Sequence, residues 1–228
     1  MPTESMPRIA AVLWDLDGTI VDSEDYWISA EVALANEHGA TWTHEDGLWQ
    51  VGQGLPVTAQ AMIDRGVQLS VPAVIDYLAQ SVLKSLQTAI PWRPGAVALL
   101  QDIAQAGIPQ ALVTMSVTPI AAFIANSIPG VHFDFVISGD TAFKQKPHPA
   151  PYLQAIEGLS VVAADCVAFE DSPSGITSAS QAGTFVIGVR HLVSIEESPA
   201  STLWDTLSGK RVTDILAARN PLSEEAQS

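Results

Sequence analysis

The sequence has almost no cysteine and few basic residues. Cys166 is the only cysteine, so no disulfide can form within the chain, and we expect a reducing compartment, the cytoplasm. Ten Lys and Arg residues stand against 25 Asp and Glu, which gives a formal net charge of -15. Such a chain repels phosphate backbones and anionic lipid headgroups, so the composition argues against binding to nucleic acid or to a membrane surface. Nothing in it indicates an oligomer, and a monomer is the default.

Long apolar runs are also missing. No stretch approaches the roughly 20 residues that a helix needs to cross a membrane. Residues 1–7 lack the basic region and the apolar segment of a signal peptide, and we expect them and residues 220–228 to be disordered tails. A chain of 228 residues with 47% hydrophobic content is long enough for one large core and a smaller second unit.

One short apolar run ends abruptly in acids. Ala10 to Trp14 is typical of a strand buried on both faces of a parallel sheet, and Asp15, Asp17 and Gly18 follow at once. In such sheets chemistry gathers where the strands end. Two acids this close repel each other unless a cation lies with them, which favours a hard divalent ion. On this stretch alone, an acidic turn that caps a helix explains the pattern equally well.

Alternating strand and helix patterns fill the second half of the chain. We expect strands at 110–113, 133–137, 166–169 and 184–189, and helices at 96–106, 119–126, 150–158, 174–182, 198–207 and 212–218. Strands that alternate with helices fold into a doubly wound parallel sheet, so the predicted fold class is α/β and Rossmann-like.

The stretch 23–91 shows only helical patterns. We expect helices from Ser23 to Gly39 and at about 44–51, 56–65 and 72–89, with no strand before Trp92. The predicted organisation is therefore a catalytic core made of residues 8–22 and 92–219, interrupted by an all-helical cap domain at 23–91.

Polar side chains follow the predicted strands at or just beyond the point where each ends: Asp15 and Asp17, Thr114 and Ser116, Lys146, and Glu170 with Asp171. Because the carboxyl ends of parallel strands share one edge, these residues should surround one small volume. Two groups of acids suit Mg²⁺, and a hydroxyl and a lysine suit the oxygens of a phosphoryl group. An aspartate held beside the metal is able to attack phosphorus. The set predicts a phosphoryl-transfer site.

The same residues carry a family resemblance. The chain resembles the haloacid dehalogenase superfamily, in the branch with a small helical cap that includes phosphoglycolate phosphatases and β-phosphoglucomutase. Its four motifs have counterparts here in Asp15-Leu16-Asp17-Gly18-Thr19, Thr114, Lys146-Pro147-His148-Pro149 and Glu170-Asp171-Ser172. The likeness covers nearly the whole chain, from about Arg8 to about Val189, and it implies a phosphate-ester hydrolase that works through an aspartyl phosphate.

The resemblance also implies a role for each matching residue. Asp15 would be the nucleophile, and Asp17 would be the general acid for the leaving alcohol and then the base for the attacking water. The implied Mg²⁺ ligands are Asp15, Asp17 through its backbone carbonyl, Asp171, and Glu170 either directly or through a water. The implied phosphate-binding residues are Leu16 through its backbone amide, Thr114, Met115 and Lys146.

Three departures from the family's mutases bear on the substrate. Trp27 stands where mutases have a histidine, the cap loop Gly52-Gln53-Gly54-Leu55 has no arginine, and Met115-Ser116 stand where mutases carry a lysine. The cap contains only Arg65 and Lys84 as cations, so a second phosphate would find little to pair with there. The residues expected to shape specificity are Trp27, Gln53 and Ser116.

We therefore expect a Mg²⁺-dependent phosphatase that acts on a small phosphate monoester of the sugar or polyol type. A sugar phosphomutase of the β-phosphoglucomutase type is the alternative, and a phosphate-responsive, non-catalytic module is a remote one. The sequence leaves open the physiological substrate and the role of His148. It also leaves open whether the cap tryptophans contact substrate or pack the cap, and packing is favoured because large apolar residues are mostly buried.

Overall fold

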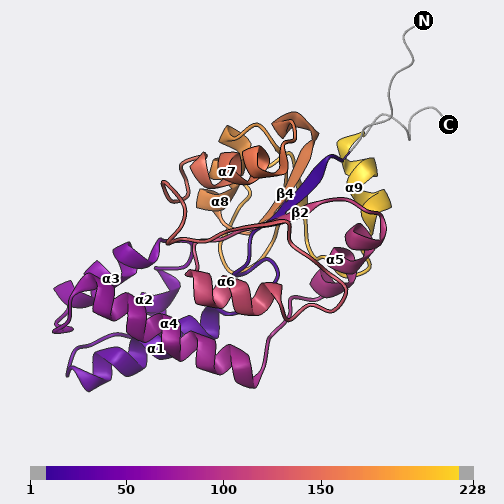
Figure 1. Ribbon diagram of the computed structural model, residues 1–228. Coiled ribbons are helices and arrows are strands. Elements are labelled where there is room, and N and C mark those ends of the chain that lie inside the picture. The colour runs from indigo at the N-terminus through magenta and orange to yellow at the C-terminus, as the bar shows by residue number, and fades with distance from the viewer. Residues whose placement is uncertain (1–8, 221–228) are drawn as a thin grey trace, which may run out of the picture.

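The computed structural model describes residues 9–220 and shows a six-stranded parallel sheet covered by helices (Figure 1). The strands are β1 (Ala11–Trp14), β2 (Gln110–Val113), β3 (Phe135–Ile137), β4 (Cys166–Glu170), β5 (Phe185–Val189) and β6 (Thr202–Trp204), in the order β3-β2-β1-β4-β5-β6. The helices are α1 (Glu24–Glu37), α2 (His44–Leu48), α3 (Leu55–Asp64), α4 (Val71–Thr88), α5 (Ala96–Gln105), α6 (Thr118–Ala125), α7 (Ala150–Leu159), α8 (Pro173–Gln181) and α9 (Val212–Arg219).

Both faces of β1 are buried, as its uninterrupted apolar run predicts. Val12 and Trp14 pack in one cluster with residues of α5, α6 and α9. Ala11 and Leu13 pack in a second cluster with α7 and α8 on the opposite face, because successive side chains of a strand point to opposite sides. The Trp14 ring stacks on Phe169 with centroids 4.3 Å apart. The predicted doubly wound α/β fold is confirmed.

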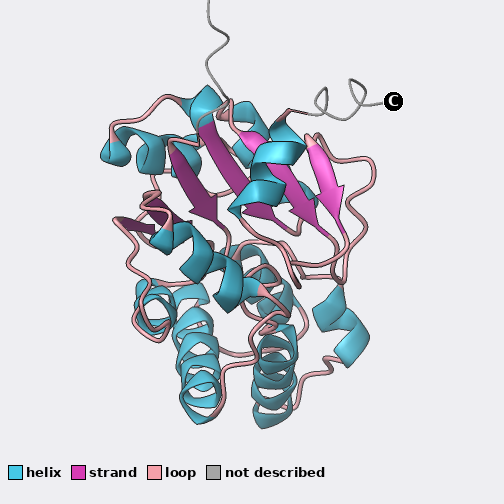
Figure 2. Ribbon diagram, turned by 90° about the vertical axis from the view of Figure 1, so that its right-hand side faces the viewer, coloured by secondary structure: helices cyan, strands magenta, loops and turns pink. Residues whose placement is uncertain are grey.

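Helices α1 to α4 lie beyond the ends of the strands to which the arrowheads point (Figure 2). Helix α4 packs against α1 and α3, and its buried residues recur at helical spacing: Val74, Leu78, Val82 and Leu86. The chain leaves the sheet at Val21 and returns at Trp92, and these two residues form an antiparallel bridge. The helical insertion is therefore joined to the sheet by two chain segments that lie side by side. Its assignment as a separate domain stays a prediction.

One predicted element is wrong. Residues 198–207 do not form a helix; Thr202–Trp204 form β6, which pairs parallel to β5 with Leu203 opposite Gly188. A Cβ at Gly188 would lie 2.7 Å from the Leu203 side chain, so the glycine allows this close pairing. A strand of three residues is too short to show a period-2 pattern, and its stability comes from pairing with a neighbour distant in the sequence.

The ends of the chain are described only in part. The predicted tails at 1–7 and 221–228 lie outside the described residues, whereas Asn220 is the C-cap residue of α9. Within residues 9–220, no helix is both long and apolar enough to cross a bilayer.

Candidate active site

The carboxyl ends of β1 and β4 bring three acids together. Asp15 follows β1, Glu170 ends β4 and Asp171 follows it, and one oxygen of each lies within 4.8 Å of the others. All three side chains are buried. Gly18 makes this packing possible, because its φ is 84° and a Cβ there would lie 2.0 Å from Asp171 Oδ2.

Lys146 connects two of these acids. Its Nζ donates to Asp15 Oδ1 and to Glu170 Oε1, each at 2.6 Å, and to the carbonyl oxygen of Val113 at 2.8 Å. The Tyr152 hydroxyl donates to the same Glu170 oxygen at 2.6 Å. The ammonium group is therefore held at the end of β2, between the ends of β1 and β4, with all three of its hydrogens engaged.

The acids of this cluster are difficult to ionise together. Burial raises the pKa of Asp15 to about 8, with Glu170 and Asp17 adding to the rise and Lys146 opposing it. Burial, and then Asp15 and Glu170, hold the pKa of Asp171 well above its usual range. Burial would lower the pKa of Lys146, but the Asp15 and Glu170 carboxylates hold it above its usual value. Three buried carboxyls beside one ammonium leave the cluster short of positive charge.

Asp17 is held by donors from both sides of the site. Its Oδ1 accepts from Ser23 Oγ at 2.5 Å and from Trp27 Nε1 at 3.2 Å. Its Oδ2 accepts from Ser116 Oγ at 2.7 Å and from Thr114 Oγ1 at 3.4 Å. The carboxylate is thereby fixed between the start of α1 and the end of β2.

A cavity of about 110 Å³ lies between these strand ends and the helices α1 to α3. Of the predicted site residues, those that line it are Asp15, Asp17, Trp27, Gln53, Met115, Ser116, Lys146 and Asp171. Three other predicted site residues, Leu16, Thr114 and Glu170, lie close to the cavity but do not line it. The Leu16 side chain is buried under the site, the Thr114 hydroxyl is turned to Asp17, and Glu170 lies behind Lys146.

The tryptophans of the helical insertion differ from one another. Trp42 is buried, as the favoured packing interpretation predicts, but Trp49 is 75% exposed and Trp27 lines the cavity. His148 is exposed, and its Nδ1 accepts from the backbone N–H of Ala150 at 3.1 Å. Its ring therefore stabilises the start of α7 and does not line the cavity.

The sequence analysis missed several polar residues on the far wall of the cavity, which is the wall formed by the helical insertion; they include Glu31 of α1 and Gln50 after α2. Glu31 is only 4% exposed, and its Oε2 accepts from Trp42 Nε1 at 3.0 Å. The spacing of Trp27 and Glu31 places them on one face of α1, so Glu31 could have been found in the sequence from its position relative to Trp27. Gln50 lies in a turn with no such signal.

The buried Glu31 should make stability depend on pH. Burial raises its pKa to about 7 from a usual 4.5, with the Trp42 hydrogen bond opposing the rise. A raised carboxyl pKa means that the unfolded chain releases the proton first, so stability is lost as pH rises from about 4.5 to about 7. Relative to Glu31→Gln, the wild type should lose about 2 kcal/mol more between pH 5 and pH 8. Urea unfolding at both pH values measures the difference.

The exposed Glu45→Gln serves as a matched control for that experiment, because it removes one acid from the same part of the chain. Its difference from the wild type should be nearly the same at pH 5 and pH 8. An equal pH dependence in wild type and Glu31→Gln would mean that the Glu31 carboxyl is as well solvated as in the unfolded chain.

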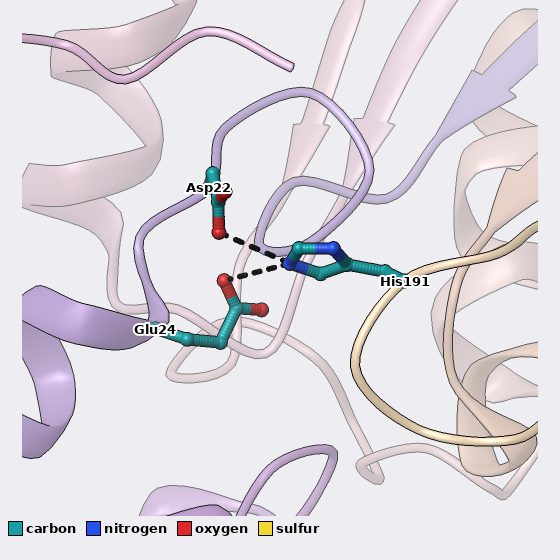
Figure 3. Close-up of side chains that lie close together, drawn as sticks. All are labelled: Asp22, Glu24 and His191. Carbon is teal, nitrogen blue, oxygen red and sulfur yellow. Dashed lines mark hydrogen bonds and ion pairs between the residues drawn. The ribbon is translucent and has the colours of Figure 1, made fainter. Parts of the chain in front are cut away.

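A second group of polar side chains joins the insertion to the loop after β5 (Figure 3). His191 Nε2 lies 3.0 Å from Asp22 Oδ1 and 3.4 Å from Glu24 Oε2. Arg93 NH1 lies 2.7 Å from His191 Nδ1. Because arginine only donates, Nδ1 accepts, and Nε2 carries the proton that reaches the acids. His191, in the loop after β5, thus contacts both ends of the helical insertion, at Asp22 and at Arg93. The adjacent guanidinium argues against a metal there.

The first acid cluster does fit a Mg²⁺ ion. Mg²⁺ binds through one or two carboxylates and keeps positions for water and phosphate. Asp15 and Asp171 both line the cavity, so their oxygens are accessible from it, and the cluster lacks positive charge. Glu170 is 0% exposed and already bonded to Lys146, which places it behind these two.

Comparisons with known proteins find a matching family model and several relatives. The family model of the haloacid dehalogenase-like hydrolases matches residues 12–189. Validoxylamine A 7'-phosphate phosphatase from Streptomyces hygroscopicus subsp. limoneus is 29% identical, over 78% of this chain and 84% of its own. Hexitol phosphatase A from Escherichia coli (strain K12) is 30% identical, over 80% of this chain and 83% of its own.

Solved structures show the same fold at lower identity. CbbY from Rhodobacter sphaeroides, in complex with phosphate, superposes with a TM-score of 0.82 at 24% identity and covers 90% of this chain and 98% of its own. The β-phosphoglucomutase of Clostridium difficile gives a TM-score of 0.80 at 22% identity and covers 93% of this chain and 98% of its own.

Proposed function

Since the chain belongs to the haloacid dehalogenase-like hydrolases, we propose that it is a Mg²⁺-dependent phosphatase of small sugar-type or polyol-type phosphate monoesters, with an aspartyl phosphate at Asp15. Relatives named as phosphatases support the class of phosphoric monoester hydrolase. The observation that carries the mechanism is the arrangement at one end of the cavity, where Asp15 contacts Lys146 and Asp17 faces the start of α1.

In the first step a carboxylate oxygen of Asp15 attacks phosphorus, and the bond from phosphorus to the leaving oxygen breaks. Asp17 gives its proton to that oxygen, and the leaving alcohol departs toward the helical insertion. In the second step a water attacks the phosphorus, Asp17 takes the proton of this water, and inorganic phosphate and free Asp15 are released. The hydrogen bonds from Ser23 and Ser116 keep the Asp17 carboxyl in the orientation that both proton transfers need.

The phosphoryl oxygens need positive charge beside the acids. Lys146 supplies one charge at the end of the cavity. Asp15, Asp171 and the backbone carbonyl of Asp17 would hold a Mg²⁺ ion, with Glu170 behind them, and when bound this ion neutralises charge on the phosphoryl oxygens.

We assign residues 23–91 the role of a cap that covers the site. Its loop rests on the sheet domain, since Ser174 Oγ donates to the carbonyl of Gly52 at 2.9 Å. At Gly54, a Cβ would lie 2.3 Å from Gln145 Oε1, so the loop and the Lys146 segment are in direct contact. A cap in this position excludes bulk water, which would otherwise compete for the phosphoryl group and screen the charges.

The test is phosphate release from a panel of sugar, polyol and nucleotide monophosphates, with Mg²⁺ and with EDTA. We expect release from sugar or polyol phosphates that needs no bisphosphate primer and falls about a hundredfold or more with EDTA. High conversion of a sugar phosphate to its isomer with a bisphosphate primer, and almost no phosphate release, would instead identify the mutase. No turnover of any ester would leave a non-catalytic module and overturn the proposal.

A further inference from the structure

The far wall of the cavity carries a carboxylate oxygen without a donor. Glu31 Oε2 accepts from Trp42, but within residues 9–220 no donor reaches Glu31 Oε1. The side chain is 4% exposed and lines the cavity. A carboxylate oxygen that faces a cavity and receives no hydrogen bond from the protein can accept one from a ligand that brings a donor.

A second unsatisfied group lies on the same wall. The side-chain oxygen of Gln50 is buried and has no hydrogen-bond partner among the described residues, and Gln50 lines the cavity with Glu31. No hydrogen bond of its side-chain nitrogen is found among these residues either, so the amide is left without a protein partner. Two polar groups without partners on one wall are uncommon in a folded protein.

The Glu31 carboxylate is held in place from two directions. Trp42 binds one oxygen, and Gly47 of α2 packs directly on it, since a Cβ at residue 47 would lie 2.9 Å from Oε2. Gly47 itself is buried. The acceptor therefore has a fixed position before any ligand binds, which reduces the entropic cost of recognition.

The charges around the cavity restrict what such a ligand carries. Five acids line it, Asp15, Asp17, Glu24, Glu31 and Asp171, and the one basic residue among its lining residues is Lys146. Lys146 is already bonded to two acids at the phosphoryl end. A carboxylate or second phosphate directed at the far wall would meet negative charge and no donor cation.

We propose that Glu31 and Gln50 form a specificity site for the leaving group, which they recognise through its hydrogen-bond donors: neighbouring hydroxyls of a polyol or sugar, or the ammonium group of an aminated sugar. This inference rests on the proposed phosphatase function and assigns the chemistry of the group that departs. Substrates whose leaving group bears an anion are disfavoured by the same residues.

The experiment compares, at pH 8, where a carboxyl with a pKa of about 7 is mostly ionised, kcat/KM of wild type, Glu31→Gln and Glu45→Gln on a hexitol phosphate, an aminohexose phosphate and phosphoglycolate. The wild type should prefer the first two. Glu31→Gln removes the charge but keeps an acceptor, so the preference for the hexitol phosphate over phosphoglycolate should fall about tenfold if hydroxyls are recognised. If an ammonium group is recognised, the aminohexose phosphate should lose about a hundredfold instead. Glu45→Gln, which is exposed, should leave both ratios unchanged.

Three results would overturn the inference. The first is a Glu31→Gln variant that loses the same factor on all three substrates, because that result indicates a structural role. The second is a wild type that prefers phosphoglycolate. Gln50→Leu should also lower the preference for the donor-bearing substrates, so the third is an unchanged ratio in both variants.

A binding experiment separates this inference from the proposed function. Calorimetry on Asp15→Asn measures hexitol phosphate binding without turnover, and adding Glu31→Gln should weaken it about tenfold. If no substrate releases phosphate but this weakening is found, the recognition site stands and the proposed function fails. If phosphate is released and neither binding nor the substrate ratio depends on Glu31, the inference alone fails.

Discussion

Replacing Asp15 with asparagine should lower Mg²⁺-dependent phosphate release by about four orders of magnitude or more. The amide has nearly the same shape as the carboxylate but is not a nucleophile toward phosphorus. Lys146 keeps its bonds to Glu170 and to the Val113 carbonyl, so the strand ends should stay in place. The rate is measured with the best substrate of the panel, and far-UV circular dichroism with urea unfolding checks the fold.

The control for this prediction is Asp25→Asn. Asp25 lies in the first turn of α1 with its side chain 90% exposed, so the same chemical change is made outside the cavity. We expect this variant to retain the wild-type rate. If Asp15→Asn kept more than a few per cent of that rate while folded, Asp15 would not be the nucleophile and another group would have to receive the phosphoryl group.

The sequence allows the strand-end side of the site to be predicted because its position follows from topology. The carboxyl ends of parallel strands lie at one edge of the sheet, so the strand order largely determines the position of a residue that directly follows a strand. Asp15 after β1 and Asp171 after β4 lie side by side for this reason, although they are far apart in the sequence. Lys146 was harder to place by topology alone, since it comes from a loop beyond β3, and the family resemblance then assigned it the role of binding phosphate.

The side of the site formed by the helical insertion could not be predicted in the same way. A helix has a buried face, but its sequence does not say whether a charged residue on that face meets solvent, another helix or a cavity. In the sequence, Glu31 resembles any acidic residue of an amphipathic helix. In the structure it is buried because Trp42 and Gly47 pack against its carboxylate. His191, which contacts Asp22 just before the helical insertion begins, follows β5 with no motif around it.

The second large effect should come from Lys146. Its Nζ is the cation that contacts the buried Asp15 and Glu170, and the side chain is only 1% exposed. Lys146→Met fills the space with an apolar chain of similar length but leaves the carboxyls, and nearby Asp171, without a counter-charge. Removing one partner of a buried ion pair costs about 3–5 kcal/mol, and we expect that loss in urea unfolding at neutral pH without divalent ions.

Added Mg²⁺ distinguishes a loss of charge compensation from a packing defect. A cation that binds the folded acid cluster, and not the unfolded chain, stabilises the protein by mass action. Because Lys146→Met leaves the acids uncompensated, Mg²⁺ should raise its midpoint of unfolding more than it raises that of the wild type. The exposed Lys144→Met, two residues earlier, makes the same substitution away from the acids and should change neither stability nor the response to Mg²⁺. If Lys146→Met were as stable as Lys144→Met, the buried carboxyls would have to be neutral in the folded protein, and electrostatic pairing would not be what holds these strand ends together.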